Sequence, residues 1–326
     1  MKEELDAYDK KILYYLDLNA RGSASQIAKK IKLPKETVNY RIKRLQKNDW
    51  IKRFYTIFNA SLFGYSYYKI YLKFHRLTAG IEKQIIEYIR SSPSCANLRI
   101  TEGQYDMVFL TIHKNISELR KFMQHFFNLF GMYVLEKNIH TMTKTHKLNQ
   151  KFLYNGKTIK KTFNQIDIRD YSLDTVDLGI IELLSTNARI KLIDIAQHLR
   201  LDSRIIKYRV KKMEQTGIIV EYTTALNLTS LNREFIQIDI VLKDPAYIPS
   251  IIDFFDSTNT CIFVYELLGK YDVSTEIYVE NDEMLRNILE KFKELFLDSY
   301  VYYDLSHVYR EYVINWSPFH AANNKQ

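Results

Sequence analysis

Residues Lys32–Gln46 read KLPKETVNYRIKRLQ and hold five Lys or Arg residues against a single Glu. The pair Leu33-Pro34 ends one helix, because proline removes a backbone donor and disfavours a helical residue before it. A new helix is predicted from about Lys35 to Lys47. Its apolar residues recur at i, i+4 and i+7, the spacing of a buried stripe, and leave a basic face exposed: Val38, Ile42 and Leu45.

Two further helices are predicted before this one, within Leu5–Leu18 and Ser25–Ile31, from the helical spacing of their apolar residues. Three short helices with a tight connection before the last are typical of a helix-turn-helix. The last helix of that motif enters the major groove of DNA, where Lys, Arg and Asn contact base edges or phosphates. The β-rich stretch Trp50–Phe58 follows and predicts a wing beside the groove.

The chain repeats itself. At an offset of 168 residues, Leu5–Asn59 and Leu173–Asn227 share 17 identical residues in 55 ungapped positions, about 31%. The similarity resumes at an offset of 166, where Gly-Gln-Tyr-Asp at 103–106 matches Gly-Lys-Tyr-Asp at 269–272. This pattern indicates a duplicated two-domain unit.

The charge is not duplicated with the sequence. Residues 1–167 hold 30 Lys/Arg and 14 Asp/Glu, which gives +16, whereas residues 168–326 hold 17 and 24, which gives −7; the sum is the formal +9 of the chain. A net positive charge favours a polyanionic partner. The opposite signs predict that the two halves do unequal work.

The predicted DNA contacts lie on the third helix and wing of the first copy and on the third helix of the second. They are Lys35, Thr37, Asn39, Tyr40, Lys43, Arg44, Lys47, Lys52, Arg53, Arg204, Lys207, Tyr208, Lys211 and Lys212. Arg41 and its counterpart Arg209 lie nearer the buried stripe. An ion pair with Asp9 or Asp177 of the first helix is as good an explanation of these two as DNA contact.

The second domain of each half is predicted to be a ferredoxin-like βαββαβ sandwich, so the fold class is α+β. A glycine tolerant of positive φ stands at each central hairpin, and turn chemistry alone can explain the Gly-x-Tyr-Asp pattern. The predicted boundaries are 1–60 and 172–228 for the two winged helix-turn-helix domains, 61–148 and 229–318 for the two sandwiches, 149–171 for a connector and 319–326 for a tail.

Several classes of protein are disfavoured by what the sequence lacks. The two Cys are 166 positions apart with no CxxC pair, which argues against a disulfide framework or zinc module, and both are expected to be buried. No signal-peptide pattern opens the chain and no run of 18 apolar residues occurs, so a cytoplasmic protein without a membrane span is expected. No phosphate-binding loop, Ser/His/Asp order or metal-ligand spacing appears, so no cofactor or metal is expected.

These motifs together resemble the leucine-responsive/asparagine-regulatory (Lrp/AsnC) family of transcription regulators, over nearly the whole chain and twice. The resemblance is carried by Leu-Asp-x-x-Asp openings at Leu5 and Leu173, Asn-Ala-Arg at 19–21 and 187–189, Ile-Ala at 27 and 195, Tyr-Arg at 40 and 208, and the Gly-x-Tyr-Asp turns. It implies a double-stranded DNA partner and dimers or dimers of dimers.

The resemblance also implies an amino-acid-like effector. By carry-over from the family, the candidate ligand residues are Gly103, Tyr105, Asp106, Gly269, Tyr271 and Asp272. The tandem fusion departs from the family pattern, and it predicts an intrachain pseudo-dimer with two unlike ligand sites. Self-association of whole chains is left open.

Three alternatives stand beside this interpretation. Sirohaem decarboxylases resemble the same fold, but none of the eight His here lies next to Gly103 or Gly269 in the sequence. An architectural protein would coat DNA with little sequence preference. In a third alternative, the second helix-turn-helix serves only for dimerisation.

Overall fold

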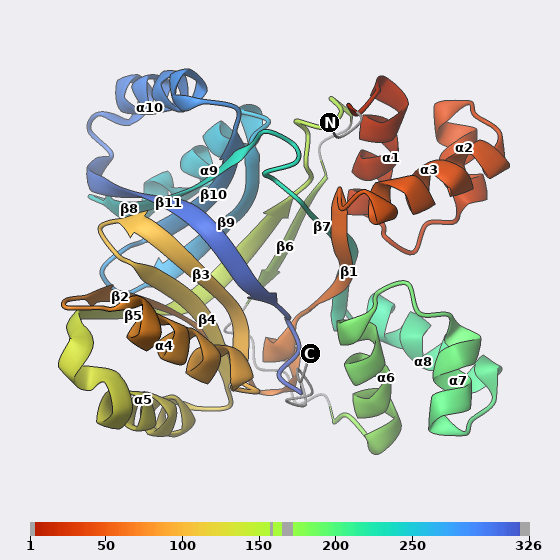
Figure 1. Cartoon of the computed structure of the whole chain (residues 1–326), viewed down its shortest axis with the longest axis horizontal. Coiled ribbons are helices and arrows are strands. Elements are labelled where there is room, and N and C mark those ends of the chain that lie inside the picture. The colour runs from red at the N-terminus through yellow and green to blue at the C-terminus, as the bar shows by residue number, and fades with distance from the viewer. Residues whose placement is uncertain (1–3, 157–158, 165–171, 320–326) are drawn as a thin grey trace.

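The computed structural model describes residues 4–156, 159–164 and 172–319. Two helix-turn-helix units lie on one side of the molecule and a large β-structure lies on the other (Figure 1). The first half comprises α1 Ala7–Leu18, α2 Ala24–Ile31, α3 Lys35–Lys47, β1 Ile51–Phe58, β2 Ser66–Phe74, α4 Ala79–Ser91, β3 Cys95–Gly103, β4 Met107–His113, α5 Ile116–Phe130 and β5 Val134–Leu148. After β6 Lys160–Asn164, the second half comprises α6 Thr175–Thr186, α7 Leu192–Leu199, α8 Ser203–Gln215, β7 Ile219–Leu226, β8 Glu234–Leu242, α9 Ile248–Ser257, β9 Cys261–Leu268, β10 Val273–Val279, α10 Asp282–Phe296 and β11 Tyr300–Ile314.

Side-chain caps fix the starts of the first two helices. Asp6 caps α1 and exchanges hydrogen bonds with Asp9 in a capping box, and Ser23 does the same with Gln26 at α2. Lys32 then turns the chain at the end of α2 with φ 57° and ψ 48°. This left-handed residue and the following Leu33-Pro34 make the tight turn that the sequence predicts.

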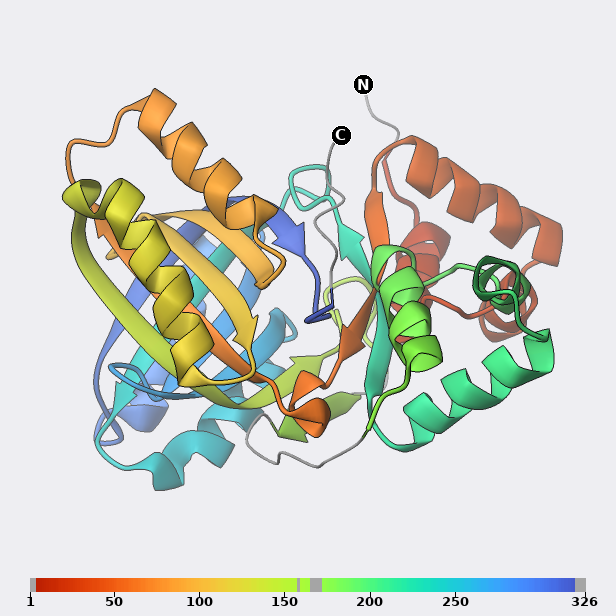
Figure 2. The same ribbon diagram turned by 90° about the horizontal axis from the view of Figure 1, so that it is seen from below.

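The strand expected as a wing is present, but its partner belongs to the other half. β1 pairs antiparallel with β7, with Phe54 opposite Thr224 and Tyr55 opposite Thr223. The two strands form a separate two-stranded sheet that joins the two helix-turn-helix units. This β1–β7 ladder stands between those units and the larger β-structure (Figure 2).

The two predicted sandwiches merge into one closed barrel. The strand order is β2-β4-β3-β11-β8-β10-β9-β5-β6, and β2 also pairs with β5. The ring is therefore closed by eight strands, and β6 of the connector is added at the outside of β5. Two seams join the halves, β3 with β11 and β5 with β9. Closure removes the exposed strand edges that an isolated four-stranded sheet would have.

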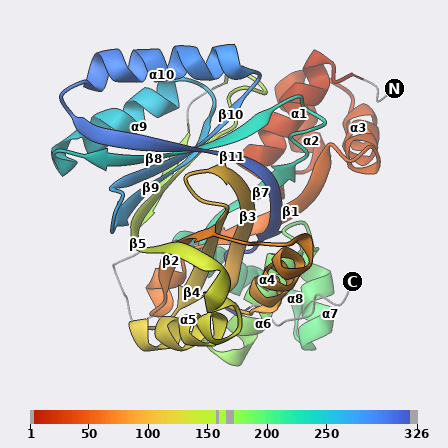
Figure 3. The ribbon, with the colours of Figure 1, turned by 60° about the vertical axis from the view of Figure 1, so that its left-hand side comes forward.

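Helices cover the outside of the barrel on two faces. Figure 3 shows α9 and α10 over one face and α4 and α5 over the other. Each pair buries its own apolar cluster, around Phe292 in the second half and Phe126 in the first. A third cluster, rich in tyrosine, lies inside the barrel and includes Tyr71, Tyr105 and Tyr271. Both cysteines are buried, as expected.

The α+β class and the repeated order of elements are confirmed. The sequence pattern predicts the last strand of each half over Tyr133–Thr141 and Val301–Val308. Both strands are longer, because β5 and β11 continue past their own sheets to pair with β9 and β3 of the other half. The connector contributes β6, and the predicted tail lies outside the described residues after Phe319. No helix in the described ranges is long and apolar enough to cross a membrane.

Ion pairs between the halves, as far as the described residues show them, share one polarity. In each, the basic side chain comes from the first half and the carboxylate from the second. They are Lys69–Glu276, Arg99–Glu276, Arg99–Glu311, Lys144–Glu266, His146–Glu266, Lys151–Asp256, Lys160–Asp253 and Lys161–Glu221. The difference in charge between the halves therefore appears at the seam where they meet.

Candidate nucleic-acid interface

The third helix of each helix-turn-helix is held by a buried stripe. In α3 this stripe is Val38, Ile42 and Leu45, and in α8 it is Ile206, Val210 and Met213; all six are at most 6% exposed. The repeat thus preserves the packing of both helices. The opposite face of each helix is left toward solvent.

The exposed face of α3 carries most of the predicted DNA contacts. Tyr40 is 65% exposed, and the four other exposed predicted residues are Lys35, Asn39, Lys43 and Lys47, with Thr37 half-buried. On α8, Tyr208 is 68% exposed, with Arg204, Lys207, Lys211 and Lys212 also exposed. Each helix therefore presents a tyrosine among cations, a surface suited to phosphates and base edges.

Arg41 and Arg209 form the ion pairs that the sequence offered as their structural explanation. Arg41 Nη1 lies 2.8 Å from Asp9 Oδ1, and Arg209 Nη1 lies 2.9 Å from Asp177 Oδ1. The backbone N–H of Asp177 and the Arg209 guanidinium hold the pKa of the Asp174 carboxyl below its ordinary value. Both arginines therefore fasten the third helix of their unit to the first.

Three of the predicted DNA contacts lie apart from the exposed face of α3, where they meet other parts of the chain. Arg44 is half-buried and its Nη2 lies 2.5 Å from Asp9 Oδ2, so it supports α3. Lys52 and Arg53 stand on β1 and line a cavity that faces the barrel. Their role at DNA stays a prediction.

A repeated motif joins the two helix-turn-helix units. Arg21 Nη1 donates to the carbonyls of Ala188 and Ile190 at 2.7 and 2.9 Å, and Arg189 Nη1 donates to the carbonyl of Ala20. The backbone N–H of Ala20 also donates to the Tyr222 carbonyl at 2.8 Å. We call these reciprocal contacts the Asn-Ala-Arg clamp. The sequence did not predict this role of the Asn-Ala-Arg motif, although the exact repetition of the motif in both halves was the available signal.

The two Gly-x-Tyr-Asp turns lie at the end of the barrel away from the β1–β7 ladder. Asp106 accepts from the Phe74 backbone at 2.8 Å, and Asp272 accepts from the Leu242 backbone at 2.7 Å. A Cβ on Gly103 would meet the backbone of Leu305 in the other half. A Cβ on Gly269 would likewise meet the ring of His140, so both glycines allow the halves to approach closely.

The tyrosines of these turns meet inside the chain. Tyr105 and Tyr271 are fully buried, and each ring lies within 5.6 Å of the Tyr71 ring, centroid to centroid. The Tyr105 hydroxyl accepts from Lys270 Nζ at 3.0 Å, and Tyr271 OH donates to Asp304 at 2.5 Å. The structure thus brings the two predicted ligand triads together, with their polar atoms engaged by intrachain partners. Their ligand role remains a prediction.

Burial shifts the pKa values of several titratable groups beside these tyrosines. Burial lowers the pKa of Lys69 from 10.5 to about 8, and it raises the pKa of Asp239. Burial, reinforced by the Lys69 charge, lowers the pKa of His140 to about 4. His140 is therefore neutral near pH 7, and its Nε2 accepts from the Tyr271 backbone at 3.1 Å. Among the described residues, no three His, Cys, Asp or Glu side chains are grouped so that they could hold a metal.

Comparison with known proteins gives the identity of the repeated unit. A family model described as winged helix-turn-helix DNA-binding matches residues 5–52 and again 173–220. The HTH-type transcriptional regulator FL11 of Pyrococcus horikoshii is 31% identical over 149 residues, which are 45% of this chain and 95% of FL11. The chain belongs to the Lrp/AsnC family of transcription regulators. It is a tandem-duplicated, DNA-binding member, since one half accounts for nearly all of FL11.

Solved structures extend this comparison to the whole chain. The siroheme decarboxylase NirDL is similar with a TM-score of 0.63 and 12% identity, covering 96% of each chain. At that identity the likeness concerns the fold alone. Escherichia coli AsnC is 24% identical, with a TM-score of 0.39, over 45% of this chain and 99% of AsnC. The Lrp/AsnC member described here thus shares its full-length arrangement with a protein of a different named activity.

Proposed function

We propose that the chain is a sequence-specific regulator that binds DNA as an intrachain pseudo-dimer, with α3 and α8 as its two recognition helices. The observation that carries this proposal is the matched exposure of both helices. Tyr40 and Lys43 of α3 correspond to Tyr208 and Lys211 of α8 at the offset of 168, and all four are exposed. Conserving buried residues requires only a fold, whereas conserving exposed cations and a tyrosine supports a shared partner.

The frame between the two helices supports the pseudo-dimer. The β1–β7 ladder and the Asn-Ala-Arg clamp connect the units at two places. Each unit would then address one half-site, and the spacing of the half-sites would be fixed by the chain. The acidic charge of the second half does not oppose this, because α8 itself is locally basic.

An effector is part of the proposal, as the family resemblance implies. The Gly-x-Tyr-Asp residues are its first candidates, and their side chains have intrachain hydrogen-bond partners. A cytoplasmic location and an operator of two unlike half-sites complete the proposal.

The test is selection of random duplex DNA with the full chain at near-physiological salt. We expect an enriched site with two half-sites about one helical turn apart. Lys43→Glu and Lys211→Glu are a matched pair, and each should weaken binding and reduce the dependence of affinity on salt by about one ion. Lys83→Glu, on the exposed surface of α4, is the control and should leave binding unchanged.

The outcomes separate the alternatives. A single half-site with an effect of Lys43→Glu alone would mean that the second helix-turn-helix serves for pairing. Binding at low salt without an enriched sequence would contradict the specific regulator and favour an architectural role.

A second candidate is an enzyme like the siroheme decarboxylases. It is favoured by the likeness to NirDL over the whole chain and by a large cavity at the barrel mouth. Addition of sirohaem should change its absorbance spectrum if this candidate is correct. No spectral change at saturating concentration would reject it.

A further inference from the structure

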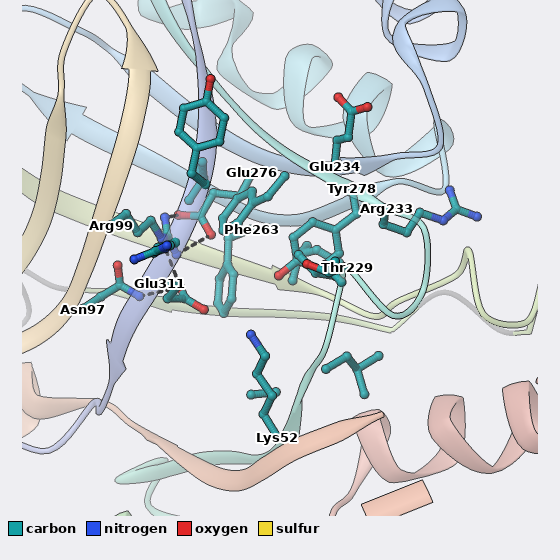
Figure 4. Close-up of a pocket in the computed structure, with 18 of the residues that line it drawn as sticks. Lys52, Asn97, Arg99, Thr229, Arg233, Glu234, Phe263, Glu276, Tyr278 and Glu311 are labelled. Atoms are coloured by element: carbon teal, nitrogen blue, oxygen red, sulfur yellow. Dashed lines mark hydrogen bonds and ion pairs between the residues drawn. The ribbon is translucent and has the colours of Figure 1, made fainter. Parts of the chain in front are cut away.

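A cavity of about 680 Å³ lies between the mouth of the barrel and the β1–β7 ladder. One wall comes from strands of the barrel, and the other comes from β1, β7 and the residues that follow β7. In Figure 4, Lys52 extends from β1 into this space, across from Arg99, Glu276 and Glu311. The Gly-x-Tyr-Asp turns stand at the opposite ends of the same barrel strands, so this cavity is separate from the predicted ligand site.

The lining includes buried polar atoms without a hydrogen-bond partner in the described part of the chain. Gln150 is 3% exposed, and its Oε1 receives no donor although its Nε2 donates to Asp17 at 3.0 Å. The hydroxyl of Thr224, which is 2% exposed, is likewise unpartnered. Arg233 Nη1 is a third such atom. Each of these atoms has almost no accessible surface, so they make the wall polar without contacting an occupant.

The carboxylates of the lining are already matched. Arg99 donates to Glu276 through both terminal nitrogens, and its Nε lies 3.0 Å from Glu311 Oε1. The other lining acids also have neighbours, Glu280 with Arg233 and Glu234 with His307. Lys52, in contrast, is exposed and forms no ion pair with any residue that the structure describes. Arg310 of β11 is a second exposed cation of the lining that has no ion pair among the described residues, so the charge left for an occupant is positive, with Lys52 on the ladder side.

Aromatic side chains make the inner wall. Phe263 stacks on Trp316 with ring centroids 5.6 Å apart and an interplanar angle of 26°, and Phe235 and Tyr278 also line the cavity. Phe263 also stacks on Tyr265, so these rings present an apolar wall to an occupant. The volume falls in the range of small-molecule sites, which combine an apolar lining with a few placed polar groups.

We propose that this cavity binds a flat aromatic or heteroaromatic molecule with one anionic group, its ring toward Phe263 and its anion toward Lys52. The occupant would contact the barrel and the strands that carry both helix-turn-helix units at once. Binding would therefore bias the position of α3 and α8 relative to the barrel. That regulatory step rests on the proposed function, whereas binding itself does not.

The test uses two fluorescent probes that differ in one charge, 8-anilinonaphthalene-1-sulfonate and the neutral N-phenyl-1-naphthylamine. Each is titrated into the full chain without DNA, so failure of this proposal is distinguishable from failure of DNA binding. We expect one saturable site that prefers the sulfonate by about fivefold, the effect of one partly solvated charge pair. Lys52→Met should abolish this preference. Thr229→Trp, at the edge of the cavity, should weaken the binding of both probes by about tenfold or more.

Lys83→Met is the matched control, because it removes an exposed lysine on α4, far from the lining, and it should change neither titration. Circular dichroism of each variant checks folding. The proposal is overturned if both probes bind equally well to the wild type, or if Lys52→Met keeps the preference for the sulfonate. The Lys52 comparison decides the matter even if the Thr229→Trp chain does not fold.

Discussion

Replacement of Arg99 by methionine tests whether the seam between the halves depends on its buried charge pairs. Arg99 is 4% exposed and Glu276 is 1% exposed, and they form two charge-assisted hydrogen bonds. After the change, the nearest cation of Glu276 would be Lys69 Nζ at 4.0 Å. Removal of one partner of a buried pair costs about 3–5 kcal/mol, because it leaves a desolvated charge without compensation.

Lys160→Met is the matched control for this change. It removes a cation from a pair of the same polarity across the same two halves, at 3.3 Å from Asp253. The side chains of Lys160 and Asp253 are 38% and 74% exposed, so the expected loss in the free energy of unfolding is about 0–1 kcal/mol. Comparing the two variants separates the effect of burying an ion pair from the effect of having an ion pair at all.

The assay is urea unfolding followed by tryptophan emission. The chain has two tryptophans, and in a Trp50→Phe background the remaining Trp316 reports on the barrel interior where it packs. Arg99→Met should lower the free energy of unfolding by several times the effect of Lys160→Met. The double change Arg99→Met with Glu276→Met should recover part of the loss. Equal effects of Arg99→Met and Lys160→Met would refute the reasoning.

Three further predictions concern acid, the clamp and the pairing of the halves. The pKa of His140 is about 4 in the folded chain and 6.5 in its ordinary state, so the unfolded chain binds more protons between these values. The free energy of unfolding should therefore fall by roughly 3 kcal/mol as the pH drops from 6.5 to 4. Urea unfolding of His140→Gln should show a smaller fall over the same pH range. Arg21→Ala and Arg189→Ala each remove one side of the clamp and should weaken DNA binding several-fold in a filter-binding assay, while the urea midpoint of the barrel stays unchanged. When the two halves are expressed together as separate chains, they should purify as a complex whose mass, measured by light scattering, is that of one copy of each half. A stable dimer of first halves alone would contradict this expectation.

Local elements were predictable because their signals are local. Pro34 and the apolar spacing predict α3 at the bounds that the structure has, Lys35–Lys47. The same spacing indicated which face of α3 is exposed. Arg41 was assigned two explanations, and only the structure decides for Asp9, since the distance between two helices is not encoded in the spacing of either.

Pairing between distant strands was not predictable from the same signals. A strand such as β1 has two edges at which another strand can pair. Its residues do not indicate whether the partner is a neighbouring strand in the sequence or the strand 168 residues away. Closure of the barrel likewise depends on β5 and β11 continuing past the point where the sequence pattern weakens. The cavity follows from both events, so its lining residues carried no collective signal. Lys52 illustrates this, because its place after a recognition helix predicted DNA contact, whereas its place in the lining of the cavity follows only from the position of the barrel.

The opposite charges of the halves gain a physical meaning at the seam. At the offset of 166, the position of Glu276 in the first half is held by Leu110, and the position of Arg99 in the second half is held by Tyr265. Two first halves paired in the same way would bury Arg99 against a leucine, and two second halves would bury Glu276 against a tyrosine. Each arrangement leaves a desolvated charge without its present partner, which costs about 3–5 kcal/mol. Duplication supplied two copies able to pair, and the divergence of their buried charges selects the pairing of unlike halves.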